Sequence, residues 1–440
     1  MGTGTSPPLA TDVAFEDQVI RKAFRHLMPF LFILMIIAYL DRINIGFAAL
    51  SMNKELQLTA AMFGFANTIF YAGYALCEIP SNILLARFGA RKWIARILIT
   101  WGLASSACMF ALGAHSLYAL RLIVGIAEAG FMPGIFLYLT YWFPPTHRAR
   151  ATSLFLFAQP ATIAIGAFLS GLILDHTHGF GGISGWRWLF LIEGFPAFLL
   201  GFVTLFYLSD GPATARWLTG AETSALQRRL QREQRSQPAH GKVWREVLSR
   251  NVILLALIYF GIIAGLNTLA TWTPQIVRDL LGPHSFSFVG LMTAVPSICA
   301  VIVMPFWGSS SDRKMERTWH IVLPMVLAAF GWVLVAVVKM PEVRMLGLIF
   351  CSAGIFAGQV VFWTVAAHIP SPRARPVGIA FISSCGVVAA SLTPLLVGWL
   401  RDLTDSWAAS LLFVAVLVLA AAALVFRIPA EEKVPPAALR

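Results

Sequence analysis

Apolar runs long enough to cross a lipid bilayer recur along the whole chain and are separated by shorter polar segments. A membrane-spanning helix needs about 20 predominantly apolar residues. Twelve runs of roughly that length cover residues 27–50, 62–85, 93–113, 117–140, 151–174, 188–209, 252–273, 287–308, 320–339, 343–367, 377–399 and 406–427. The pattern predicts an all-α membrane protein with six spanning helices, a polar gap and six more.

The two groups of apolar runs, the polar gap between them and the two polar ends give five predicted segments. We expect, in order, an N-terminal tail, a six-helix bundle, a linker, a second six-helix bundle and a C-terminal tail, at residues 1–26, 27–209, 210–251, 252–427 and 428–440. Residues 222–230 of the linker have a charged helical pattern, which predicts a surface helix.

The two predicted bundles show signs of a duplication. Arg87 and Arg313 follow the second and eighth runs, and Arg91 and Arg317 lie at the same separation of 226 residues. The same shift carries the start of the first run to the start of the seventh. Two repeated six-helix halves are an architecture of secondary transporters, which bind substrate near the middle of the membrane between the halves.

Composition and charge placement agree with this membrane assignment. The chain is 58% hydrophobic and 12% charged, with a net charge of +12. Of its 33 lysines and arginines, 25 fall on the N-terminal side of the predicted membrane, 6 fall on the other side, and Arg42 and Arg121 lie within it. The positive-inside rule therefore predicts cytoplasmic termini in an inner (plasma) membrane, with the lipid bilayer rather than nucleic acid as partner.

Cysteine and histidine placement gives no indication of a metal site or an enzyme. The five cysteines stand singly inside apolar runs, and the histidines lie scattered near loops without an HExxH pattern. We expect no disulfide, no metal, no cofactor and no enzymatic activity.

Four charged side chains fall inside the predicted membrane. Asp41 and Arg42 are adjacent in the first run, and Arg121 and Glu128 stand two helical turns apart in the fourth. Charges at such depth cost about 2.5–3.5 kcal/mol each and usually mark function. Structural ion pairs between helices are the alternative. Tyr74 and Gln159 add hydrogen-bonding groups at depth, although each could be a satisfied core residue.

The loops carry a family resemblance. The segments 82–91 and 308–317 resemble the G-x-x-x-D-R-x-G-R-[RK] signature of the major facilitator superfamily, whose fold has twelve helices in two pseudo-symmetric halves. The first copy departs from the signature, with Ala86 in place of the aspartate. The resemblance implies that a cytoplasmic gate is formed around Arg87, Arg91, Asp312 and Arg313.

A narrower resemblance comes from the first half. Tyr-Leu-Asp-Arg-Ile-Asn-Ile-Gly-Phe-Ala at 39–48, Gly-Ile-Ala-Glu-Ala-Gly-Phe-Met-Pro-Gly at 125–134 and Leu-Phe-Leu-Ile-Glu-Gly-Phe-Pro-Ala at 189–197 resemble the anion:cation symporter family of organic-anion permeases. The resemblance implies proton coupling at Asp41 and Glu128. It implies an anion site at Arg42, Arg121, Tyr74 and Gln159.

The second half departs from that family in the eleventh run. Ser383 and Val387 stand where the family has asparagines, and the loss of two amides leaves a more apolar wall. With Asn267 and Trp363 in nearby runs, this favours an aromatic or otherwise less hydroxylated acid. A sugar acid or a dicarboxylate is the alternative.

The expected function is proton-coupled uptake of a small organic anion by a monomer. An arginine can grip a carboxylate, and an arriving anion that neutralises the arginine would let a neighbouring acid take up a proton. An exchanger or uniporter with the same fold, a membrane-embedded enzyme and a non-transporting sensor are the alternatives.

Overall fold

The computed structural model describes residues 10–235, 246–366, 368–369 and 375–429. Within them, twelve helical stretches are long and apolar enough to span a membrane, which agrees with the twelve predicted runs. The ends of both predicted tails and the middle of the predicted linker lie outside the described residues. The chain is an almost entirely helical, multi-pass membrane protein.

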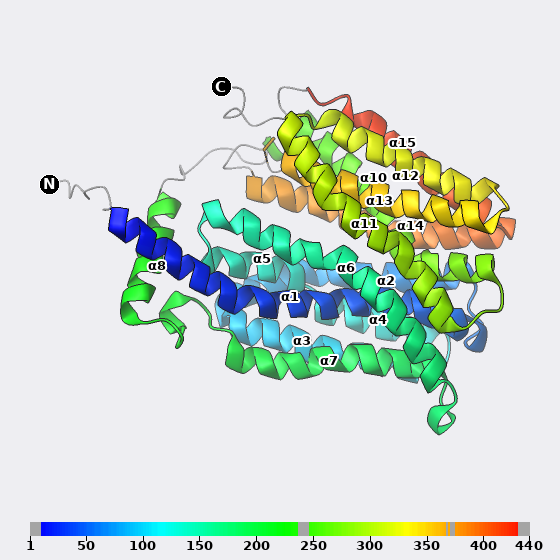
Figure 1. Cartoon of the computed structure of the whole chain (residues 1–440). Helices are drawn as coiled ribbons and strands as arrows, with labels where there is room; N and C mark the ends of the chain where they lie inside the picture. The colour runs from blue at the N-terminus through cyan, green and yellow to red at the C-terminus, as the bar shows by residue number, and fades with distance from the viewer. Residues whose placement is uncertain (1–9, 236–245, 367, 370–374, 430–440) are drawn as a thin grey trace.

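The helices form two bundles, which lie one above the other in Figure 1. The first half contains α1 (Ala10–Glu55), α2 (Ala60–Phe88), α3 (Ala90–Ala107), α4 (Ala114–Glu128), α5 (Phe131–Trp142), α6 (Pro145–Thr177) and α7 (Gly185–Tyr207). The second half contains α10 (Arg250–Leu281), α11 (Phe286–Lys314), α12 (Thr318–Val337), α13 (Pro341–Ala366), α14 (Arg375–Thr404) and α15 (Trp407–Val425). Between them, α8 (Gly220–Arg235) lies where the charged pattern predicts a surface helix.

Among the described residues, the main contacts between the halves are made by three helix pairs: α6 with α11, α2 with α14, and α1 with α10. Small residues allow the first two pairs to pack backbone against backbone. A Cβ on Gly64 of α2 would lie 2.3 Å from the carbonyl oxygen of Pro394, and one on Gly290 of α11 would lie 2.4 Å from that of Ala167. Close helix approach through small residues is how membrane helices associate without a hydrophobic driving force.

We call the end of the bundle where α8 lies the linker end, and the opposite end, where α1 leads into α2 and α6 into α7, the far end. At the linker end α8 is tied to the long first helix. Lys22 pairs with Glu222 at 2.8 Å, and Glu16 accepts hydrogen bonds or ion pairs from Arg229 and Arg232. The linker helix therefore belongs structurally to the first half.

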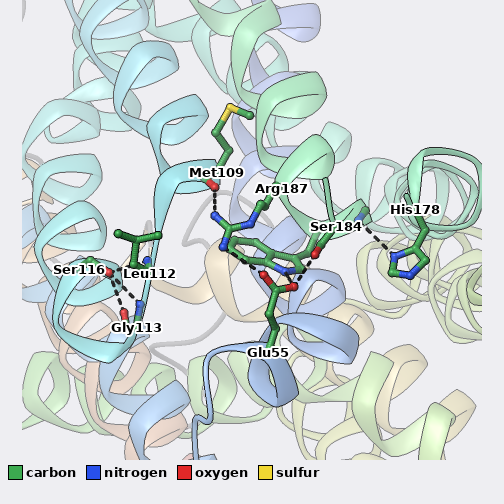
Figure 2. A network of polar contacts seen from close by, with 10 residues as sticks. Glu55, Met109, Leu112, Gly113, Ser116, His178, Ser184 and Arg187 are labelled. Atoms are coloured by element: carbon green, nitrogen blue, oxygen red, sulfur yellow. Dashed lines mark hydrogen bonds and ion pairs between the residues drawn. The ribbon is translucent and has the colours of Figure 1, made fainter. Parts of the chain in front are cut away.

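At the far end, each half is held together by an acid that ends its first helix. Glu55 accepts hydrogen bonds from Ser184 at 2.5 Å and Arg187 at 3.1 Å (Figure 2). The indole of Trp186, the second residue of α7, donates to it at 2.7 Å. In the second half Asp279 of α10 accepts from the indole of Trp407, which opens α15, at 2.7 Å. The first and last spanning helices of each half are thus joined internally, as expected of two rigid bodies.

Candidate functional site

The middle of the first half contains a broken helix. The predicted span 117–140 is divided into α4, which ends at Glu128, and α5, which begins at Phe131. Gly130 has φ of +87°, and a Cβ there would lie 2.3 Å from the hydroxyl of Ser81. A residue without a side chain is therefore required at the break. Transporters commonly build their binding sites at such interrupted helices.

Glu128 at this break forms an ion pair with Arg42 of α1. The guanidinium Nη2 lies 2.6 Å and Nε 2.8 Å from the same carboxylate oxygen, Oε1. The other oxygen, Oε2, has no hydrogen-bond partner within the described residues. The side chain of Glu128 is fully buried, whereas that of Arg42 is 18% exposed. Arg42 is therefore the member of the pair that an incoming anion can reach.

Aromatic rings surround the free faces of Arg42. Its Cζ lies 5.4 Å from the ring centre of Tyr74 and 5.6 Å from that of Tyr39, both within the range of cation–π attraction. Tyr74 was predicted for the anion site, and the structure places it beside the arginine. Tyr39 was not predicted, although it stands three residues before Arg42 and therefore shares its helix face.

Arg121 lies on α4, two turns from Glu128, and is almost fully buried, with 2% of its surface exposed. Its Cζ lies 4.5 Å from the ring centre of Phe70. Its Nε has no hydrogen-bond partner, and in the described part of the chain it makes no ion pair with an acid. A buried guanidinium without a carboxylate in direct contact is costly, so this position favours an anion.

Asp41, the neighbour of Arg42, points into the first half instead. Its carboxylate accepts hydrogen bonds from the indole of Trp101 at 2.6 Å, from the amide of Asn44 at 3.0 Å and from the hydroxyl of Ser105. Only 2% of its surface is exposed. These three neutral donors hold the side chain away from Arg42, so the two predicted proton-coupling acids occupy different surroundings.

The second half presents an aromatic cluster. Tyr259 of α10 stacks on Phe362 at a centroid distance of 5.4 Å and meets Trp363 edge-on at 4.9 Å. A Cβ on Gly386 of α14 would lie 2.4 Å from the Tyr259 ring, so glycine leaves the space that the tyrosine fills. Trp363 was predicted for the site, whereas Tyr259 was not.

Asn267 is placed differently from the other predicted substrate residues. Its amide donates to the carbonyl oxygen of Ala390 at 3.0 Å, and its own oxygen accepts from Thr271 at 3.1 Å. With 5% of its surface exposed, it joins α10 to α14 inside the second half. Gln159 is buried in α6, and Ser383 is half-buried in α14.

The four predicted gating residues lie at the linker end; they are Arg87, Arg91, Asp312 and Arg313. None of the hydrogen bonds, ion pairs or ring contacts of these described side chains crosses between the halves. In the first half, where the signature aspartate is replaced by Ala86, the backbone N–H of Arg91 donates to Asp210 at 2.9 Å. In the second, Asp312 pairs with Arg317 at 2.7 Å.

The family model of the major facilitator superfamily matches residues 31–370 and 283–440. The chain belongs to the major facilitator superfamily. It is therefore a membrane transporter and not an enzyme. This finding confirms the fold and family that the helix count, the duplication and the loop motifs predict.

Sequence relatives of this transporter include a protein of Agrobacterium vitis named putative tartrate transporter, which is 43% identical over 92% of this chain and 94% of its own length. A protein of Pseudomonas putida named putative metabolite transport protein NicT is 36% identical over 92% of this chain and 93% of its own length. Among solved structures, an inward-facing bacterial homologue of the human lysosomal transporter Spinster has a TM-score of 0.75 at 17% identity, covering 98% of each chain. That last likeness concerns the fold alone.

The donors to Asp41, like Tyr39 and Tyr259, are site residues that the sequence did not predict in this transporter. Trp101 and Ser105 stand four residues apart on α3, so they share one helix face. Asn44 lies three residues after the aspartate it contacts. A search for polar residues at helical spacing opposite Asp41 would have identified them.

Proposed function

We propose that this transporter carries an organic anion together with a proton by alternating access. The observation that carries the proposal is the Arg42–Glu128 pair, in which the arginine is partly exposed and the acid is fully buried. An anion that binds Arg42 competes with Glu128 for the same guanidinium. Binding of the anion and release of the acid are thereby linked.

The proton follows from the cost of burying a charge. A carboxylate that loses its cation in a fully buried position is destabilised by several kcal/mol unless it takes up a proton. Substrate binding at Arg42 would therefore favour protonation of Glu128, and loss of the proton would favour the Arg42–Glu128 pair again. This exchange couples the anion to the proton without requiring direct contact between them.

Arg121 also supports an anionic substrate, because it is buried and forms no direct ion pair with an acid among the described residues. Asp41 is our second proposed proton-coupling group; it is buried and accepts hydrogen bonds from Trp101 and Ser105. Gln159 and Tyr74 complete the proposed anion site.

We propose two substrate classes for the same site. The Tyr259–Phe362–Trp363 cluster supports an aromatic carboxylate, because it offers ring faces and edges and few hydrogen-bonding groups. The names of the relatives that are 43% identical support a small hydroxylated dicarboxylate such as tartrate.

The proposed orientation places the linker end and both termini in the cytoplasm of a cell with an inner membrane, because most lysines and arginines lie on that side. The far end then faces outward, and transport is inward. We propose that a single chain is the functional unit, since the proposed site takes its residues from both halves of one chain.

The test uses purified transporter in liposomes containing a pH-sensitive dye, to which tartrate, a sugar acid, phthalate and a hydroxylated phenylacetate are added in turn. We expect acidification of the lumen with one class of acid. The signal should disappear in Glu128→Gln and weaken in Asp41→Asn, and it should persist in Asp405→Asn, a control at an exposed acid.

Exchange or facilitated diffusion is the alternative outcome. Uptake of labelled acid without proton movement, unchanged in Glu128→Gln and Asp41→Asn, would retain the transporter and remove the coupling. If no acid in the panel is taken up or binds, the proposed substrate class is wrong.

A further inference from the structure

At the far end, two aspartates each cross from one half to the other. Asp175, near the end of α6 in the first half, accepts hydrogen bonds from the backbone N–H groups of Phe286 at 2.9 Å and Ser287 at 2.7 Å. Those two residues open α11 in the second half. Thus α6 of the first half supplies the carboxylate, and α11 of the second half supplies the helix N-terminus that the carboxylate contacts.

The same contact occurs in the opposite direction. Asp402, near the end of α14 in the second half, accepts from the backbone N–H groups of Ala60 at 3.0 Å and Ala61 at 2.7 Å. Those residues open α2 in the first half. The two helix starts are 226 residues apart, and the two aspartates are 227 apart, close to the spacing of the duplicated loop motifs. The contact is therefore a duplicated feature of the fold.

Each of these helices also has its own cap. Thr59 accepts from the N–H of Met62 at 3.3 Å, and Ser285 accepts from that of Phe288 at 3.2 Å. The first N–H groups of a helix have no partner within it. The helix's own cap and the aspartate from the other half serve different N–H groups, so the aspartates are additional to normal capping.

We propose that Asp175 and Asp402 form a paired latch that holds the far end of the transporter closed. A carboxylate at a helix N-terminus gains from charge-assisted hydrogen bonds and from the helix dipole. Both gains are lost when α6 separates from α11 and α14 from α2. The acids that tie helices within each half, Glu55 and Asp279, keep their partners during that movement.

The two latches are unequal. Asp175 also accepts from the Ser287 hydroxyl at 2.6 Å, a third donor, whereas the corresponding residue facing Asp402 is Ala61, which has no hydroxyl. We therefore expect Asp175 to hold its helix pair more strongly than Asp402 holds the other. The proposal rests on alternating access and is independent of the substrate and of proton coupling.

The experiment measures how often the far end opens. Thr293 of α11 is buried, with 5% of its surface exposed, one turn beyond the Gly290 contact with α6. A Thr293→Cys variant without the native cysteines is reacted with a membrane-impermeant maleimide from the far side of oriented vesicles. We expect Asp175→Ala to raise the labelling rate about 3- to 10-fold, and Asp402→Ala to raise it less.

The matched controls are Thr59→Ala and Ser285→Ala, which remove a cap from the same two helices without touching the other half. We expect neither to change labelling. Asp175→Asn and Asp402→Asn keep size and one acceptor oxygen, and they give intermediate rates if the charge contributes. Equal labelling in the aspartate variants and the parent, or an equal rise in the cap controls, overturns the latch. These outcomes leave the liposome test of proton coupling unaffected.

Discussion

The two halves share one scaffold but differ in chemistry. Among the described residues, the buried acids and the buried arginine in the middle of the bundle all belong to the first half: Asp41, Arg121, Glu128 and Glu193. The second half instead presents the aromatic cluster of Tyr259, Phe362 and Trp363. The two copies of the duplicated fold therefore differ, since the first contains buried charged side chains and the second contains a cluster of aromatic rings. Under the proposed mechanism, the first half would bind the anion and the proton, and the second half would select the substrate.

The largest effect is expected where the charge is removed. Arg42→Ala takes away the proposed anion grip and leaves Glu128 buried without its cation, which typically costs about 3–5 kcal/mol when one partner is removed. We expect anion affinity to fall by about 100-fold or more, measured by ligand-induced thermal stabilisation of the purified protein. Arg42→Lys keeps the charge but loses the planar geometry, and should recover only part of the affinity.

Arg401→Ala is the control, because that arginine lies at the far end beside Asp279. Retention of full affinity in Arg42→Ala would show that Arg121 alone carries the anion. The division of roles within the first half would then need to be redrawn.

A smaller effect is expected from the aromatic cluster. Trp363→Leu removes the ring that meets Tyr259 edge-on, and aromatic contacts of this kind contribute about 0.5–1.5 kcal/mol. We expect the ratio of affinities for an aromatic acid and tartrate to change about 2- to 10-fold, measured by competition. The pH dependence should stay the same, since no charge is altered. A shift in pH dependence would contradict the division between the halves.

A third prediction concerns Asn267, which the structure places between α10 and α14. Asn267→Ala removes hydrogen bonds to Ala390 and Thr271, and leaves buried groups without partners. We expect the apparent free energy of unfolding to fall by about 1–3 kcal/mol, measured by SDS titration, with little change in anion affinity. Ser383→Ala, at a half-buried position on α14, should change stability by less than about 0.5 kcal/mol. A large loss of anion affinity in Asn267→Ala, with little loss of stability, would instead assign Asn267 to the substrate site.

Helix number, duplication and family could be predicted because they depend on patterns that repeat over twenty residues or more. The depth of Asp41 and Arg42 could also be predicted, because it follows from their position in an apolar run. Their opposite orientations could not. They depend on Trp101 and Ser105 of α3, which lie sixty residues or more away in the chain and donate hydrogen bonds to Asp41.

The break at Gly130 and the aspartates at the far end were missed for a related reason. Gly130 is required because Ser81 of α2 approaches it, and no local pattern in α4 records that neighbour. Asp175 and Asp402 look like ordinary loop acids until α11 and α2 are placed beside them. The second half was harder to predict, since a neutral polar residue in a membrane helix can also serve packing between helices.

The smallest effect is expected at the linker, whose described ion pairs reach only the first half. Hydrogen bonds from Lys22 lower the pKa of Glu222 below its ordinary value of 4.5. The pair therefore stabilises docking of α8 above that value, and the contribution is lost as the pH falls through the lowered pKa. Lys22→Gln should loosen α8 by about 0.2–1 kcal/mol near neutral pH, since Lys22 is largely exposed, and should have no effect in acid. A spin label at Gln231→Cys would report the mobility of α8, with Arg21→Gln as the control at a neighbouring exposed cation. If Lys22→Gln changes the mobility of α8 equally at neutral and acid pH, Lys22 acts through packing. The charge of Lys22 would then not be what holds the linker against the first half.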